Sequence, residues 1–208
     1  MDGIINLPLF LISSLIIVIA PGPDFIYVTT RGISEGNRAG ILSAFGISTG
    51  LLIHTLFAAF GLSAIIQASR TAYLIIKYIG AGYLIYLGLR SLIKRNKTTG
   101  DKIKIENKRK NIFRQGVITN VFNPKAIVTF MAFLPQFVDI KISHPIWQFT
   151  SLGLILSLMA VIWFGTVGYF AGTMGAFIGK SKTIQKWIKL ISGSIMIALG
   201  LRLAIKRN

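Results

Sequence analysis

The sequence predicts an all-α membrane protein with six transmembrane helices, and its composition and its apolar segments are the observations behind this prediction. Of the 208 residues, 53% are hydrophobic, and the mean hydropathy is +0.67. Only 14% are charged, whereas about 25% are charged in a typical soluble domain. Most of the long apolar segments approach or exceed the roughly 20 residues that a helix needs to span a bilayer, and they lack the alternation of β-barrel strands. The six segments are Ile4–Ala20, Gly40–Ile66, Tyr73–Ile93, Val117–Val138, Trp147–Ile178 and Ile184–Ile205.

The first segment is expected to be a retained span, because the N-terminus MDGIINLP lacks the basic residues of a signal peptide. It is interrupted by Pro21, Gly22, Pro23 and Asp24. Two prolines remove two backbone donors and clash with the preceding turn. In a bilayer, such irregular backbone is tolerated only where it is buried in protein or lines a watery cavity. Taken alone, the motif also fits a simple proline kink, which is common in membrane helices.

The second segment carries His54 near its middle. A histidine at this depth is either a hydrogen-bonded packing residue or a proton carrier, since its pKa lies near physiological pH. Glycines spaced four residues apart predict close helix approach here and elsewhere. These glycines are Gly32, Gly36 and Gly40, together with those of GISTG (46–50), GYFAG (168–172) and GAFIG (175–179).

Positive charge is concentrated on one side of the predicted membrane topology. Of 23 Lys and Arg residues, 16 lie in the connectors of that side and six in those of the other, while one, Lys125, lies within a span. Arg31 and Arg38 belong to the first of these connectors, and most of the others to the linker 94–112. The positive-inside rule therefore puts this linker in the cytoplasm and both termini outside. Its expected partner is anionic lipid. Nucleic acid is not expected despite the net charge of +17, because no aromatic residues are interleaved for stacking on bases.

The two halves of the chain resemble each other. KYIGAGYLIYLGLR (77–90) and KLISGSIMIALGLR (189–202) share seven of fourteen residues, and Asn123-Pro124 interrupts the fourth segment much as the PGPD motif interrupts the first. Three spans followed by three spans must insert in opposite orientations. We therefore expect one membrane domain, 1–208, built of two inverted repeats (1–93 and 113–208) whose first helices are broken. Transporters of this architecture bind substrate near the midplane between broken helices.

Asp24 and Lys125 each follow the proline of a break and lie near the middle of an apolar segment. A charge at the centre of a membrane helix costs about 2.5–3.5 kcal/mol on insertion scales, so it is usually paired, hydrated or functional. The two residues either form a structural ion pair or bind the ammonium and carboxylate of a zwitterion. Asn120 lies nearby on the fourth segment, and Asn123 is a candidate cap for the half-helix that starts at Pro124.

No enzyme, cofactor or metal site is expected. Asp24 is the only acidic residue at membrane depth, and no serine–histidine or paired-carboxylate arrangement accompanies it. The chain has no cysteine and only two histidines, which are too few and too scattered to suggest a metal site.

Two blocks of the sequence resemble the LysE/RhtB family of amino-acid exporters, and its homoserine/threonine-exporter branch in particular. The blocks are residues 20–66, with Pro21-Gly22-Pro23 and His54, and residues 113–138, with Asn123-Pro124-Lys125. The resemblance covers nearly the whole chain. It implies a multi-pass protein of the bacterial inner membrane that exports amino acids, is driven by the proton gradient and forms a dimer.

The predicted function is therefore proton-coupled export of amino acids or related small zwitterions. The expected transport residues are Pro21, Gly22, Pro23, Asp24, His54, Asn120, Asn123, Pro124 and Lys125. The alternative is a passive channel or a lipid-translocating protein built on the same broken helices.

The predicted topology can be tested with single cysteines, since the chain has none of its own. With Asn96→Cys in the basic linker and Asn208→Cys at the C-terminus, a membrane-impermeant thiol reagent applied to intact cells should label only the second. Equal labelling of both positions from outside would contradict the six-span topology.

Overall fold

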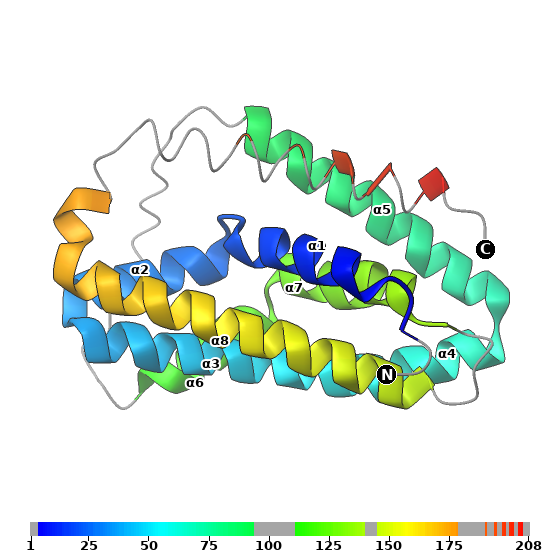
Figure 1. Cartoon of the computed structure of the whole chain (residues 1–208), viewed down its shortest axis with the longest axis horizontal. Helices are drawn as coiled ribbons and strands as arrows, with labels where there is room; N and C mark the ends of the chain where they lie inside the picture. Colours follow the sequence, from blue (N-terminus) through cyan, green and yellow to red (C-terminus); the bar gives the residue numbers. More distant parts are fainter. Residues whose placement is uncertain are drawn as a thin grey trace.

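The computed structural model describes residues 4–93, 111–139 and 145–178, together with scattered residues between 190 and 205. These parts are helical, and no strand occurs among them apart from one isolated bridge between Ile4 and Val138. The first half contains α1 (Leu7–Ile19), α2 (Pro23–Glu35), α3 (Asn37–Leu56), the π-helical turn η1 (Phe57–Leu62), α4 (Ser63–Ala68) and α5 (Arg70–Ile93). The second half contains α6 (Ile112–Val121), α7 (Pro124–Val128), the π-helical η3 (Thr129–Phe133), the 3₁₀-helical η4 (Leu134–Phe137) and α8 (Pro145–Ile178) (Figure 1).

The apolar helices confirm an all-α membrane protein. Two described helices, Asn37–Ile65 and Pro145–Thr173, are long and apolar enough to cross a membrane. The number rises to four if each of two bent helix pairs is counted as one span. The predicted third span coincides with α5, and most of the predicted sixth span lies outside the described residues, as does the linker 94–110.

Both predicted helix breaks are present. The chain bends by 53° between α1 and α2, and by 50° between α6 and the segment Pro124–Phe137. Pro23 and Pro124 each occupy the first turn of the helix that follows, where a missing N–H costs nothing. Asn123 caps α7, since its side chain accepts a hydrogen bond of 2.9 Å from the backbone N–H of Lys125, which confirms the expected cap.

Close glycine contacts hold the long helices together. A Cβ on Gly40 of α3 would overlap the backbone of Gly168 of α8, and a Cβ on Gly46 would overlap the backbone of α6 at Phe113. The packing role is therefore confirmed for the predicted glycines that make such contacts, whereas the surroundings of Gly175 and Gly179 lie outside the described part of the chain. Gly36 is an exception: a Cβ there would meet nothing within 4 Å, and its φ of 88° turns the chain between α2 and α3.

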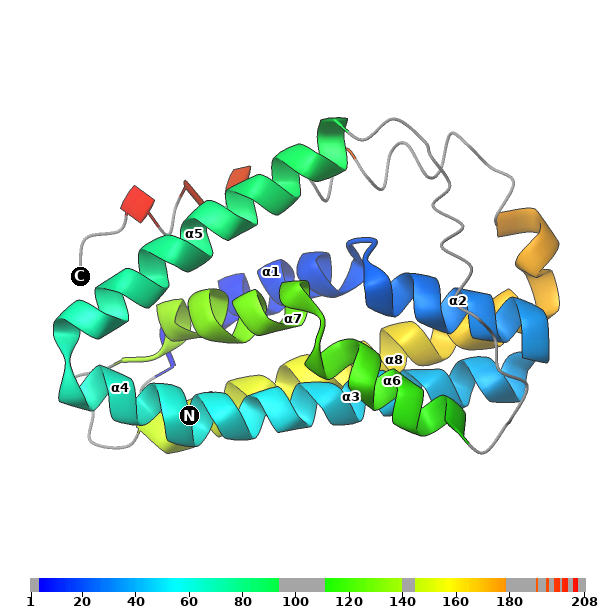
Figure 2. The same ribbon diagram turned by 180° about the vertical axis from the view of Figure 1, so that it is seen from behind.

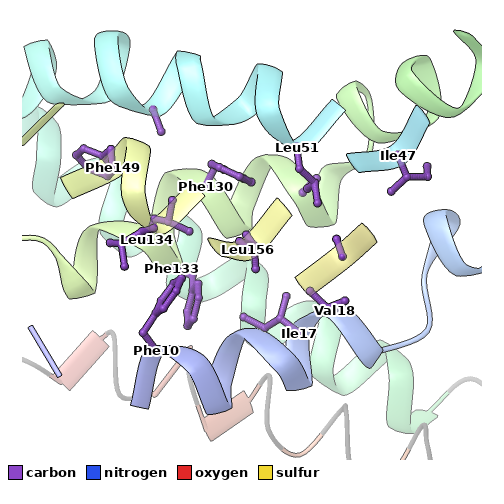
Figure 3. Close-up of a cluster of buried hydrophobic side chains, with 14 of the residues drawn as sticks. Phe10, Ile17, Val18, Ile47, Leu51, Phe130, Phe133, Leu134, Phe149 and Leu156 are labelled. Carbon is purple, nitrogen blue, oxygen red and sulfur yellow. The ribbon is translucent and has the colours of Figure 1, made fainter. Parts of the chain in front are cut away.

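The interior and the outer surface are both apolar. Phe10, Phe133 and Leu156 belong to a large buried cluster to which α1, η3 and α8 contribute (Figure 3). Other large apolar side chains point outward, and a soluble monomer rarely exposes so many. This outer surface fits a lipid environment. Its members include Leu15, Phe45, Phe57, Ile79, Leu158 and Ile162.

The helices form an elongated bundle with two distinct ends (Figures 1 and 2). At one end lie the start of α1, the start of α8 and the η1–α4 region. We call it the Phe10 end. At the other end lie the end of α2 and the starts of α3 and α6. We call it the Arg31 end. The two helix breaks lie between these ends.

The glycine contact between α3 and α8 predicts a difference between two substitutions in one helix. Gly168→Ala places a Cβ against the backbone of Gly40, and such overpacking costs about 1–3 kcal/mol. Gly165→Ala is the matched control, because a Cβ there meets nothing within 4 Å. Thermal unfolding in detergent should show a lowered midpoint for the first variant and an unchanged or raised midpoint for the second. Equal midpoints would contradict this packing.

Candidate functional site

The two helix breaks meet through Lys125. This residue lies in the first turn of α7, and its Nζ donates a hydrogen bond of 2.6 Å to the backbone carbonyl of Ala20. Ala20 ends α1, where the break leaves carbonyl groups without helical N–H partners. A lysine of the second half thus compensates the broken backbone of the first, and the two breaks lie near one another.

Asp24 makes the second contact across the breaks. It lies in the first turn of α2, is 8% exposed, and its Oδ2 accepts a hydrogen bond of 3.0 Å from Nδ2 of Asn120 on α6. The backbone carbonyl of Asn120 in turn accepts a hydrogen bond of 3.3 Å from Nε2 of His54 on α3. Asp24, Asn120 and His54 therefore connect three helices through a buried polar chain. The ring of His54 also stacks on Phe130, with 5.5 Å between centroids.

Asp24 and Lys125 face one cavity without forming an ion pair. The described residues contain no bond of 4.0 Å or less between the two charged groups, although both line a cavity of about 30 Å³. This volume holds a water molecule or two, whereas sites for small molecules measure about 300–1,000 Å³. The two charged groups thus make no ion pair within 4.0 Å, and the cavity that both line is too small for a substrate.

Three buried polar atoms around the breaks make no hydrogen bond of standard geometry in the described structure, although the side chains of Asn123 and Asp24 interact with each other. The three atoms are Oδ1 of Asp24, Oδ1 of Asn120 and Nδ2 of Asn123. Leaving a buried donor or acceptor unsatisfied costs about 1–3 kcal/mol, so such a cluster calls for an explanation. The set contains a donor, a neutral acceptor and a carboxylate oxygen. A ligand with both an ammonium and a carboxylate group would satisfy it.

The other predicted site residues shape the breaks. Pro23 and Pro124 are exposed and start the two half-helices, while Pro21 lies in the first break. A Cβ on Gly22 would lie 3.4 Å from Cδ of Lys125, so the missing side chain lets the lysine pass close to the backbone. No group of three His, Cys, Asp or Glu that could hold a metal ion occurs among the described residues.

No sequence motif marks the remainder of the cavity wall. Besides Asp24 and Lys125, the cavity is lined by Ile17, Val18, Leu51, Ala126, Thr129, Leu156 and Phe164. These residues come from α1, α3, α7, η3 and α8, and no motif marks them. Apolar residues of this kind look the same in sequence whether they face lipid, the core or a cavity.

The Phe10 end is closed by aromatic contacts between the two halves of the chain. Phe10 of α1 stacks on Phe133 of η3 (Figure 3), with 5.9 Å between ring centroids. Phe10 also meets Phe137 of η4 edge-on at 5.2 Å. The backbone N–H of Ile5 also donates to the carbonyl of Phe137 at 2.9 Å. These contacts seal α1 against η3 and η4.

The Arg31 end is closed by polar contacts. The hydroxyl of Tyr27 on α2 donates a hydrogen bond of 2.6 Å to the carbonyl of Ile112 at the start of α6. Arg31 donates to Glu35 and to Gln115 of α6, and its guanidinium lies 5.6 Å from the centre of the Tyr27 ring. The predicted topology places Arg31 in a connector, but this residue is buried within α2 and belongs to the closure of the Arg31 end.

The protein consists of apolar helices, and two helix breaks lie beside a polar site between two closed ends. This combination is that of a membrane translocator. The chain belongs to the LysE type translocator family, whose sequence profile matches residues 15–207.

Several relatives extend this match over nearly the full chain. The uncharacterized membrane protein YrhP of Bacillus subtilis is 32% identical over 89% of this chain and 91% of its own length. An uncharacterized membrane protein of Vibrio cholerae is 30% identical over 94% of both chains. The leucine efflux protein of Salmonella typhimurium is 26% identical over 97% of this chain and 96% of its own length. No solved structure matches the chain.

Proposed function

We propose that the protein is a secondary transporter that exports amino acids, or closely related zwitterions, across the bacterial inner membrane in exchange for protons. The observation that carries this proposal is the placement of Asp24 and Lys125, which line one cavity from two broken helices without pairing with each other. Membership of the LysE type translocator family and the similarity to a leucine efflux protein support it.

In this proposal Lys125 binds the carboxylate of the substrate. Its ammonium group is held by the Ala20 carbonyl, a neutral partner that a carboxylate can replace or join. Asp24 binds the substrate ammonium through Oδ1, the oxygen that makes no hydrogen bond of standard geometry while Asn120 binds Oδ2. Both contacts are charge-assisted, and such hydrogen bonds are roughly twice as strong as neutral ones. Removing either side chain leaves a substrate charge unpaired in an apolar surrounding, which is costly.

Exchange for protons follows from competition at one carboxylate. A protonated Asp24 no longer attracts an ammonium group, whereas an ionised Asp24 does. A proton arriving from outside therefore favours release of the amino acid, and an amino acid arriving from inside favours release of the proton. His54 contacts the backbone of the same Asn120 whose side chain binds Asp24, and it is the candidate for a second protonation site beside Asp24.

The two closures supply the gates of alternating access. If the halves are inverted repeats, α1 corresponds to α6, and α2 to the segment Pro124–Phe137. The two closures are then counterparts on opposite membrane faces: α1 contacts η3 and η4 in one, and α2 contacts α6 in the other. The two breaks, which bend by 53° and 50°, act as hinges for opening one closure at a time. We place the Arg31 end in the cytoplasm, on the side of the linker 94–112.

The charge contacts predict that Lys125→Ala abolishes export. The loss should exceed about tenfold, which corresponds to 1.4 kcal/mol, because the substrate carboxylate loses its charged partner. Arg38→Ala, at an exposed basic residue of α3, is the matched control and should export normally. The assay is amino-acid uptake into inverted membrane vesicles at equal protein levels, with and without an uncoupler.

Asp24→Asn should weaken transport and reduce its dependence on the proton gradient. The charge swap Asp24→Lys with Lys125→Asp should not restore export, because the surroundings of the two residues differ. Near-normal export by Lys125→Ala would contradict the proposed site. Transport that survives the uncoupler would instead indicate a passive channel.

The two gates predict that a cross-link at either end stops transport. Cysteine pairs can be placed at Phe10 and Phe137, or at Arg31 and Gln115, in a chain that has no other cysteine. A reducible thiol cross-linker should abolish transport with either pair, and reduction should restore it. Each single-cysteine variant treated in the same way is the control. Continued transport by a fully cross-linked pair would contradict the assignment of that closure as a gate.

A further inference from the structure

We infer that the transported amino acid carries an apolar side chain, and that Leu51, Leu156 and Phe164 select it. The inference rests on the proposed function, since it takes Asp24 and Lys125 as the partners of the substrate ammonium and carboxylate. Every α-amino acid has both of these groups. Selection among amino acids must therefore come from the remainder of the cavity wall.

That wall is almost entirely apolar. Away from the two charged residues, Thr129 is the only polar member among the described lining residues, and its hydroxyl is already donated to the carbonyl of Lys125 at 2.7 Å. A substrate side chain in this cavity meets Ile17, Val18, Leu51, Ala126, Leu156 and Phe164. Figure 3 shows Leu51, Leu156, Ile17 and Val18 gathered on the inner faces of α3, α8 and α1.

The fixed side of this wall is formed by α3 and α8. The glycine contact between Gly40 and Gly168 ties these helices together, and Gly153 packs directly against Thr55. Asp24 and Lys125, the proposed partners of the substrate ammonium and carboxylate, lie instead on the half-helices that follow the two breaks. The present cavity of about 30 Å³ is too small for an amino acid, so it must widen. Movement at the breaks opens space between the two charged residues and the wall formed by α3 and α8. Leu51, Leu156 and Phe164 stay in place on that wall.

This wall separates substrate classes by their side chains. An apolar side chain gains free energy in proportion to the area that it removes from water. In this wall the hydroxyl of threonine or homoserine meets only the acceptor lone pairs of Thr129 Oγ1, and the side-chain ammonium of lysine is left without a counter-charge. The sequence resembles the homoserine/threonine-exporter branch, but the cavity favours leucine, isoleucine, valine and methionine.

The experiment is transport by the purified wild-type protein in liposomes loaded with unlabelled amino acid. Uptake of labelled leucine is measured against a panel of competitors. Leucine, isoleucine and methionine should compete at least about tenfold more strongly than threonine, homoserine or lysine, the lower range expected for a difference of apolar contact. Equal or stronger competition by threonine or lysine would overturn the inference while leaving the proposed exporter intact. Absence of transport for every amino acid would overturn both.

Two variants assign the selection to particular residues. Leu156→Thr should lower the ratio of leucine to threonine transport about tenfold, whereas Leu158→Thr should leave it unchanged, because Leu158 is 61% exposed on the outer face of the same helix. Phe164→Ala enlarges the cavity and should shift the preference toward phenylalanine. Size-exclusion chromatography establishes folding of each variant. Unchanged preferences in folded Leu156→Thr and Phe164→Ala proteins would overturn the assignment of these residues.

Discussion

The rest of the structure depends on the two helix breaks. The hydrogen bond from the Lys125 ammonium to the Ala20 carbonyl joins them. Each break exposes backbone groups in a region where no water is at hand to satisfy them. The lysine satisfies a carbonyl of one break and itself lies in the first turn of the half-helix that follows the other. The side chains of Asp24 and Asn120 add a second hydrogen bond between the two halves, from α6 to α2. The breaks thus stabilise each other, and they leave two opposite charges beside one small cavity.

The two ends of the molecule show how such a site can be isolated from both solvents. Aromatic rings close the Phe10 end, and a buried arginine with its hydrogen-bond partners closes the Arg31 end. Each closure joins the first half of the chain to the second, while α3 and α8 remain tied by glycine contacts. Only the short segments on either side of the breaks then need to move. A buried polar closure and an apolar one differ in the solvent that they can admit, so the two gates need not open with equal ease.

Much of this site could be predicted from the sequence, because proline and charge are conspicuous in apolar segments. The breaks at Pro23 and Pro124 and the cap at Asn123 follow from local rules, whereas the hydrogen bond between Asp24 and Asn120 joins residues 96 positions apart. The direction of apolar side chains does not follow from local rules either. Leu156 and Leu158 are two residues apart in one uniform segment, yet the first is 1% exposed and the second 61%. The burial of Arg31 could not be predicted either, because its partner Gln115 lies 84 residues away in the sequence.

Direct binding of substrate analogues tests most sharply whether Asp24 and Lys125 hold the two ends of a zwitterion. The measurement is the thermal stabilisation of the purified protein by leucine, by leucinamide, which lacks the carboxylate, and by 4-methylpentanoate, which lacks the ammonium. The wild-type protein should be stabilised by leucine alone. Lys125→Ala should no longer distinguish leucine from leucinamide, while Arg38→Ala should behave as the wild type. Equal stabilisation of the wild-type protein by all three compounds would contradict the account.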